Sequence, residues 1–362
     1  MRKTYIKNFD ALRVIAFLCV FVSHMFINAE DTFIDGEFIK WSKIGIIGVD
    51  FFFVLSGFLI TWIAINNPDK IFSFRSFIKK RILRIVPLYL LMVLIGYLLN
   101  LLSVNEIIQP INKLPSIGYY LFFISNFYNA YFDHNYLIFL VILWSIAAEM
   151  QFYFCWGFIL KFFRKKLLLF VGIFISISIL FKFYFLLIKP DSKQVYFNFF
   201  SVMGNFGIGG FFAYAVVQKY HWIKLILNKN FLSRQLIYFS TLALISLNFS
   251  CSNPVFNIFS KYIVLLLFGL ILILLGFSNH NIKPKKNSIL GKLGKISYGM
   301  YCYHGLVVTI AIKLIAHFEV GRDGMLSLLV YPFLMLLMTI ILSVLSYRFF
   351  EGVFLSLKEK IQ

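Results

Sequence analysis

The sequence contains ten apolar runs that are each long enough, or nearly so, to cross a lipid bilayer as a helix. A hydrocarbon layer of about 30 Å requires about 20 helical residues. The runs cover residues 9–28, 44–65, 85–102, 137–160, 167–188, 195–217, 235–250, 258–277, 296–316 and 325–347. Only 14% of the residues are charged, against roughly 25% in soluble globular proteins. The predicted fold class is therefore all-α, a polytopic membrane helix bundle with about ten transmembrane helices.

The Lys and Arg residues separate the two sides of this layout. With the N-terminus in the cytoplasm, the inner segments hold 25 of the 35 basic residues and the outer loops hold six. Cytoplasmic loops are enriched in Lys and Arg, so both termini are predicted to be cytoplasmic. The net charge of +20 then reflects topology and attraction to anionic membrane lipids, and we expect no nucleic acid partner.

The four cysteines form no CxxC pair, so neither a disulfide framework nor a metal site is predicted. The first apolar run is too long for a signal peptide and lacks a small-residue cleavage site, and we expect it to stay as a helix. The apolar stretch 117–130 is ringed with Asn and Tyr and is predicted to lie at the membrane interface.

Ionisable side chains inside the apolar runs are the candidate functional residues, because each costs about 2.5–3.5 kcal/mol at the membrane centre. Arg13 and His24 in the first run are separated by about three helical turns. They therefore share one helix face and lie about 16 Å apart along its axis. Such a polar stripe suits a reaction that takes a reagent from one side and delivers it to the other. Lys182, Lys261 and Lys313 could snorkel to the interface.

Asp50 and His24 are predicted to lie at a similar depth. Asp50 is about 9 Å from the outer end of its run, and His24 is about 6 Å from the outer end of its own. A carboxylate on one imidazole nitrogen would fix the tautomer and support the other nitrogen as a general base. The alternative is a structural hydrogen bond that holds two helices together.

Glu149 is near the centre of the run 137–160, which carries no other charge. It is predicted to be a catalytic acid or base or a counter-ion to Arg13, and the alternative is a protonated side chain bonded to a backbone carbonyl. His304 lies among aromatic residues, and a donor-binding residue and a satisfied core histidine are equally consistent with that position.

Arg81 and Arg84 are three residues apart in a cytoplasmic segment and share a helix face. Planar guanidinium groups there would suit the phosphates of a donor molecule. Ordinary anchoring by the positive-inside rule is the alternative explanation.

Six sequence blocks resemble the acyltransferase 3 family of integral membrane acyltransferases, in family order and over almost the whole chain. They are FDALRVIAFLCVFVSH (9–24), GVDFFFVLSGFLIT (48–61), KKRILRIVPLYLL (79–91), WSIAAEMQFYF (144–154), GKISYGMYCYHG (294–305) and SYRFFEGVF (346–354). The chain departs from the family pattern in lacking a Trp beside His304 and in carrying Gly352 after Glu351, where a Pro is common. Both departures affect only helix ends.

The resemblance implies transfer of an acyl group, most often acetyl, from a cytoplasmic coenzyme A thioester to a hydroxyl of a surface glycan. It implies that Arg13 and His24 are the functionally required pair and that Arg81 and Arg84 match the family's basic motif. Many relatives add a soluble extracytoplasmic domain. We expect residues 1–362 to form a single transmembrane domain without one, which acts alone or passes the acyl group to a separate partner.

The sequence thus predicts an O-acyltransferase of a bacterial plasma membrane, with acetyl-CoA or another acyl-CoA as donor and a polysaccharide or its lipid-linked precursor as acceptor. The predicted catalytic residues are His24, Asp50 and Glu149, and the predicted donor-binding residues are Arg13, Arg81, Arg84 and His304. The alternative function is a transporter or flippase with an intramembrane Arg, His and Glu path. The oligomeric state is left open.

Overall fold

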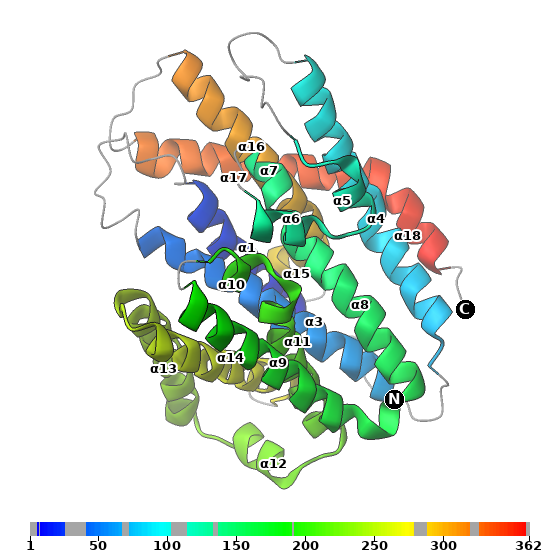
Figure 1. Cartoon of the computed structure of the whole chain (residues 1–362), viewed down its shortest axis with the longest axis vertical. Coiled ribbons are helices and arrows are strands. Elements are labelled where there is room, and N and C mark those ends of the chain that lie inside the picture. Colours follow the sequence, from blue (N-terminus) through cyan, green and yellow to red (C-terminus); the bar gives the residue numbers. More distant parts are fainter. Residues whose placement is uncertain are drawn as a thin grey trace. The chain divides into compact units, whose positions relative to one another are not determined.

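Every regular element in the described part of the chain is a helix. The computed structural model describes residues 6, 8–25, 41–66, 72–102, 114–132, 137–189, 192–278, 288–318 and 326–359 (Figure 1). In the apolar interior of a bilayer, a helix satisfies its backbone N–H and C=O groups within one segment. The apolar runs of this chain therefore fold as helices, and the predicted all-α class is confirmed.

Nine helices among the described residues are long and apolar enough to cross a membrane, against the ten that the sequence predicts. They are Asn8–Met25, Lys43–Ile65, Phe74–Leu101, Ile138–Phe162, Arg164–Ile188, Gln194–Val217, Pro254–Phe277, Ser297–Ile315 and Tyr331–Leu357. The predicted run 235–250 folds as α13 (Phe231–Ser250), which carries Arg234 near its start and is less apolar than the other nine. The side of the membrane on which each terminus lies stays a prediction.

The chain divides into two compact units, each assembled from three segments. Unit 1 takes its described residues from 1–16, 47–74 and 149–294, and unit 2 from 17–46, 75–148 and 295–362. The division cuts through the middle of α1 (Asn8–Met25), near the start of α8 (Trp144–Phe162), and through the end residues of α4 (Phe74–Leu102) and α15 (Ile289–Lys295). His24 therefore belongs to unit 2, whereas Glu149 belongs to unit 1.

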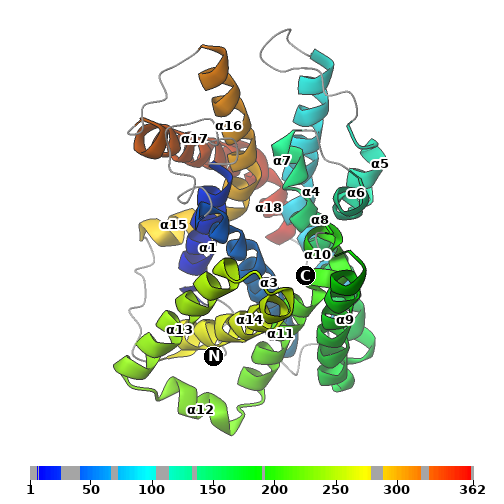
Figure 2. The ribbon, with the colours of Figure 1, turned by 60° about the vertical axis from the view of Figure 1, so that its left-hand side comes forward.

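Unit 1 is organised around α11 (Phe199–Val217), which packs against α3 (Ile47–Ile65), α9 (Leu167–Ile188) and α14 (Pro254–Phe277) (Figure 2). Its apolar core includes Val54, Phe58, Phe212 and Leu272. The other helical elements of unit 1 are η3 (Arg164–Lys166), α10 (Gln194–Phe197), α12 (His221–Leu227), α13 and α15 (Ile289–Lys295).

Two glycines allow α3 and α11 to meet backbone to backbone. A Cβ atom on Gly57 of α3 would lie 2.0 Å from the carbonyl oxygen of Phe206, and one on Gly209 of α11 would lie 2.0 Å from that of Val54. Small residues let helix backbones approach closely in membrane bundles. This contact brings Asp50 of α3 beside Asn205 of α11.

Local capping explains where α14 begins. The side chain of Asn253 accepts hydrogen bonds from the backbone N–H groups of Val255 and Phe256, and Pro254 occupies the first helical position. An Asn cap satisfies otherwise unpaired N–H groups, and Pro needs no hydrogen-bond partner there. The start of α14 in turn sets the positions of Lys261 and Tyr262, which lie two turns further along the helix.

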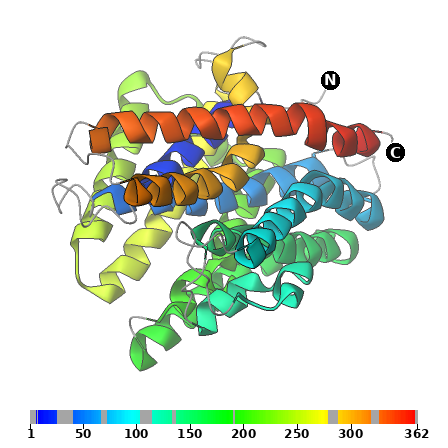
Figure 3. The same ribbon diagram turned by 90° about the horizontal axis from the view of Figure 1, so that it is seen from above.

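In unit 2, α16 (Ser297–His317) packs against α17 (Tyr331–Ser346) and α7 (Ile138–Val141). From α17 the chain continues through η5 (Tyr347–Glu351) into α18 (Gly352–Glu359) as one nearly continuous helical run (Figure 3). The other elements of unit 2 are η2 (Lys43–Ile46), α4 (Phe74–Leu102), α5 (Ile117–Leu121), α6 (Ser125–Tyr131) and η4 (Leu326–Val330). The predicted interfacial stretch 117–130 thus forms the short helices α5 and α6.

Candidate functional site

Unit 2 brings together two of the predicted site residues, His24 of α1 and His304 of α16. Nδ1 of His24 lies 3.0 Å from Nε2 of His304, which is hydrogen-bonding distance. The two rings are stacked, with their centroids 5.2 Å apart and their planes 26° from parallel. The sequence analysis assigns the two histidines to different roles, and their direct contact is a finding of the structure.

His304 is completely buried, and its second ring nitrogen is also engaged. Nδ1 of His304 lies 2.5 Å from the backbone carbonyl oxygen of Tyr301, one turn earlier in α16. The ring of Phe17 packs edge-on against the imidazole at a centroid distance of 5.7 Å. His304 is therefore a satisfied core histidine, as one of the two alternatives holds, and it is also the partner of His24. Its predicted donor-binding role stays a prediction.

The helix that carries His304 is tied to α8 by a tyrosine that the sequence analysis did not single out. The hydroxyl of Tyr301 lies 2.6 Å from Oγ of Ser145, and it also donates to the carbonyl oxygen of Ile142 at 3.3 Å. Tyr301 and Ser145 are both buried. These bonds fix the turn of α16 that presents its backbone carbonyl to His304.

Two of the predicted donor-binding arginines, Arg81 and Arg84, lie on α4 and are both partly exposed. The guanidinium of Arg81 lies over the ring of Phe77, 5.6 Å from its centroid. Arg84 is close enough to Glu351 for its positive charge to stabilise the Glu351 carboxylate. Glu351 is a buried residue at the end of η5, and it accepts a hydrogen bond from Ser346 at 3.2 Å. The sequence alone provides no reason to pair Glu351 with Arg84, because the two residues are far apart along the chain.

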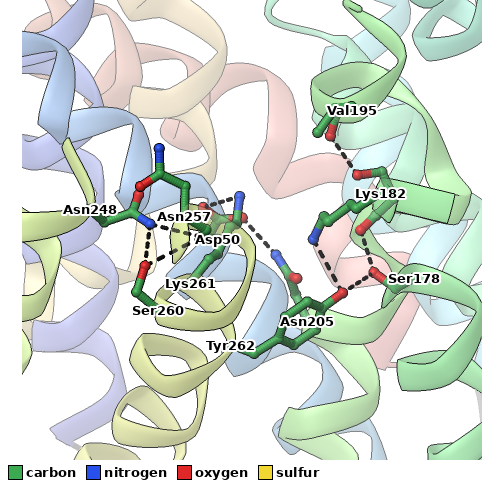
Figure 4. A network of polar contacts seen from close by, with 11 residues as sticks. Asp50, Ser178, Lys182, Val195, Asn205, Asn248, Asn257, Ser260, Lys261 and Tyr262 are labelled. Carbon is green, nitrogen blue, oxygen red and sulfur yellow. Dashed lines mark hydrogen bonds and ion pairs between the residues drawn. The ribbon is translucent and has the colours of Figure 1, made fainter. Parts of the chain in front are cut away.

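In unit 1, Asp50 is the centre of a buried polar network (Figure 4). Its Oδ1 accepts a hydrogen bond from Nδ2 of Asn205 at 2.6 Å, and its Oδ2 forms an ion pair with Nζ of Lys261 at 3.1 Å. Both carboxylate oxygens are therefore engaged within unit 1. The predicted pairing of Asp50 with His24 stays a prediction, and the partner that the structure gives to His24 is His304.

A second series of hydrogen bonds lies beside this ion pair (Figure 4). Nζ of Lys182 donates to the hydroxyl of Tyr262 at 3.3 Å, and this hydroxyl donates to Oγ of Ser178 at 2.7 Å. Ser178 in turn donates to the backbone carbonyl of Ser201. Lys182 is only 2% exposed, so it is buried rather than snorkelling to the interface. The spacing of Ser178 and Lys182, one turn apart in an apolar run, was the available sequence signal.

Glu149 of α8 accepts hydrogen bonds from the hydroxyls of Ser56 and Tyr153. Arg13 forms its ion pair with Asp10, one turn earlier in α1, at 2.8 Å. Arg13 therefore has one ion partner in the neighbouring Asp10, and Glu149 accepts from two hydroxyls. The predicted pairing of Arg13 with Glu149 stays a prediction. No group of three or more His, Cys, Asp or Glu side chains in the described ranges is arranged to hold a metal ion.

These features define a class of protein: a multi-pass helical membrane protein with a paired imidazole and several partnered carboxylates among its apolar helices. The family model of an acyltransferase domain, that of the acyltransferase 3 family, matches residues 6–348. The chain therefore belongs to the acyltransferase 3 family, and the predicted resemblance is confirmed. Family membership favours acyl transfer over the transporter alternative.

Curated relatives are similar over different shares of the chain. A Staphylococcus aureus (strain COL) protein named "Putative O-acetyltransferase" is 28% identical over 97% of this chain and 57% of its own length. The peptidoglycan O-acetyltransferase OatA of Listeria monocytogenes is 32% identical over 45% of this chain and 25% of its own length. A Bacillus subtilis protein named "Putative peptidoglycan O-acetyltransferase" is 34% identical over 42% of this chain. The chain spans little more than half the length of the Staphylococcus aureus relative, and no solved structure matches it.

Proposed function

We propose that this chain transfers an acyl group, acetyl in the first instance, from acyl-CoA to a hydroxyl of a cell-surface polysaccharide or its lipid-linked precursor. Membership of the acyltransferase 3 family supports the reaction class. The names of the Listeria and Bacillus relatives support O-acetylation and a glycan acceptor. Because those relatives are bacterial, we also propose a bacterial plasma membrane location.

The observation that carries the proposed mechanism is the state of the His24 imidazole. Its Nδ1 is held by His304, and its Nε2 has no hydrogen-bond partner among the described residues. An imidazole that is oriented at one nitrogen and unpartnered at the other is arranged as a general base. In the proposed reaction, Nε2 takes the proton of the acceptor hydroxyl as its oxygen attacks the thioester carbonyl carbon. The carbon–sulfur bond breaks, and the proton passes to the departing thiolate.

The arginines are proposed to bind the donor. Arg81 and Arg84 lie one turn apart on α4, and guanidinium groups match phosphate oxygens in a bidentate geometry. Arg13, which is partly exposed and paired with Asp10, is proposed to bind the donor as well. Asp50 and Glu149 remain candidate catalytic carboxylates. Both oxygens of Asp50 have partners within unit 1, and one oxygen of Glu149, Oε1, accepts from both Ser56 and Tyr153.

The experiment compares surface glycans from cells that express wild-type protein, His24→Ala or an empty vector. We expect one additional acetyl group per modified residue, measured by mass spectrometry, only with the wild type. The exposed His221 of α12 provides a matched histidine control, and His221→Ala should acetylate like the wild type.

A purified sample with labelled acetyl-CoA gives the complementary measurement, because it does not depend on the acceptor present in the host. Full transfer activity in His24→Ala would contradict the general-base role. Uptake or export of substrate without consumption of the thioester would contradict acyl transfer itself and support the transporter alternative.

A further inference from the structure

The backbone carbonyl of Tyr301 determines the direction of the hydrogen bonds through the two histidines. A carbonyl oxygen can only accept, so the Nδ1 of His304 that faces it at 2.5 Å must carry the proton. A neutral imidazole has one donor and one acceptor nitrogen, which leaves the Nε2 of His304 with a lone pair. This lone pair faces the Nδ1 of His24 at 3.0 Å, and that nitrogen must therefore be the donor.

The opposite direction is physically unfavourable at this position. If Nε2 of His304 donated to His24, a neutral His304 would point its Nδ1 lone pair at the carbonyl oxygen of Tyr301. A doubly protonated His304 would avoid this repulsion, but it would place a positive charge on a side chain that is 0% exposed. The hydrogen-bonding and ring partners of His304 in the described part of unit 2 are His24, the backbone of Tyr301 and Met300, and the rings of Tyr301 and Phe17, and none of them is a carboxylate.

We infer that His304 is a positioning residue that holds His24 in the Nδ1–H tautomer, with the lone pair on Nε2 available to accept a proton. This inference rests on the proposed function for its catalytic consequence, but the tautomer itself is a property of the unreacted protein. The carbonyl of Tyr301 fixes the proton of His304 on its Nδ1, and the Nε2 lone pair of His304 then fixes the proton of His24 on its Nδ1. From its sequence position His304 is predicted to bind the donor, whereas its contacts in the structure favour a positioning role.

The same arrangement serves the proton transfer. When Nε2 of His24 takes the proton of the acceptor hydroxyl, His24 becomes an imidazolium whose Nδ1–H still donates to the neutral Nε2 of His304. A hydrogen bond with a charged donor is stronger than a neutral one. His304 thereby stabilises the protonated base without itself gaining a proton, and the proton on Nε2 is available for the departing thiolate.

Three substitutions at His304 separate this role from simple core packing. His304→Phe keeps a ring of similar volume against Phe17 and removes both nitrogens. His304→Gln can place its amide oxygen where Nε2 lies and so restore an acceptor for His24, whereas the shorter His304→Asn cannot reach. Thr309→Val is the matched control, because Thr309 is also buried on α16 and, within the described ranges, its hydroxyl bonds only to the carbonyl of Gly305.

The measurements are steady-state transfer from labelled acetyl-CoA and nitrogen-15 NMR of selectively histidine-labelled protein, with His24 assigned by difference from His24→Ala. We expect wild-type His24 as the Nδ1–H tautomer. His304→Phe should shift His24 towards the Nε2–H tautomer that a free side chain favours in water. It should also lower kcat by at least about tenfold, with the KM for acetyl-CoA unchanged. His304→Gln should recover part of the loss, His304→Asn should not, and Thr309→Val should match the wild type.

A wild-type protein with His24 as the Nε2–H tautomer would overturn the inference, whatever its activity. Equal kcat for His304→Phe and the wild type would overturn it as well. A wild type that shows the Nδ1–H tautomer but transfers no acyl group would contradict the proposed function and leave the positioning role intact. If His304→Phe fails to fold, the wild-type tautomer and the contrast between His304→Gln and His304→Asn still decide the question.

Discussion

The close contact of α3 and α11 leads to a quantitative prediction for Gly57→Ala. The added Cβ atom would lie 2.0 Å from the carbonyl oxygen of Phe206, whereas ordinary contact begins at 3.4 Å, so the backbones must separate by about 1.4 Å. No side chain can rotate away, because the obstructing atom belongs to the helix backbone. Overpacking costs up to about 3 kcal/mol, and the better helix propensity of Ala returns about 1 kcal/mol. We therefore expect a loss of about 2 kcal/mol of unfolding free energy.

The same chain contains a matched control at Gly172 of α9, where an added Cβ atom would meet nothing within 4 Å. Gly172→Ala is the same chemical change in a helix of the same unit, and only the propensity gain of about 1 kcal/mol applies to it. The two variants should therefore differ by about 3 kcal/mol in opposite directions from the wild type. Gly57→Ala should also disturb Asn205, the neighbour of Phe206, and so lengthen its 2.6 Å bond to Asp50.

The assay is reversible unfolding by SDS in mixed micelles, followed by far-ultraviolet circular dichroism. Both variants are purified in the same detergent as the wild type, and the unfolding free energies are compared at one mole fraction of SDS. If Gly57→Ala is as stable as Gly172→Ala, the backbone contact between α3 and α11 does not exist in the folded protein, and the packing argument fails.

Three further substitutions test charged side chains of unit 1. Lys261→Met should cost about 1–3 kcal/mol, since it leaves the Asp50 carboxylate with Asn205 alone, and SDS unfolding measures the loss. Lys182→Met should leave stability equal or higher in the same assay, because Lys182 is 2% exposed and its one hydrogen bond is to Tyr262; a loss as large as that of Lys261→Met would refute this account. Glu149→Gln keeps an amide oxygen that can accept from Ser56 and Tyr153, so stability should be unchanged while acetyl transfer falls at least tenfold. Wild-type activity in this variant would remove Glu149 from the catalytic residues.

The helices were predictable because the hydrophobic pattern that defines them is local. Nine of the ten predicted runs became helices that can span a membrane. The exception, α13, has Arg234 near its start, and this residue donates to the backbone carbonyls of Leu227 and Lys229 at the preceding turn. The Arg234 side chain thus stabilises the turn between α12 and α13 by hydrogen bonding to its carbonyl groups, and a hydropathy pattern does not reveal such a role.

The candidate residues were predictable one by one, but their partners were not. Arg13 and His24 do lie on one unbroken helix, α1, as their spacing predicts. His24 and its partner His304 are 280 residues apart, and Asp50 and Asn205 are 155 apart. Helical rise fixes the depth of each residue at about 1.5 Å per position, but depth does not determine which neighbouring helix a side chain faces. The hypothesis that paired His24 with Asp50 used depth alone.

A neutral partner for His24 has a physical advantage over the carboxylate that the sequence suggested. A carboxylate beside an imidazole fixes the tautomer, but in an apolar interior its own charge requires further donors, as Asp50 illustrates by engaging both Asn205 and Lys261. His304 supplies a lone pair to His24 without a formal charge, and one backbone carbonyl is enough to fix its orientation. His304, which is fully buried, therefore orients His24 without needing a charged partner of its own. In the proposed mechanism, His24 carries a positive charge only while the proton is in transit, and His304 stabilises that charge as a neutral acceptor.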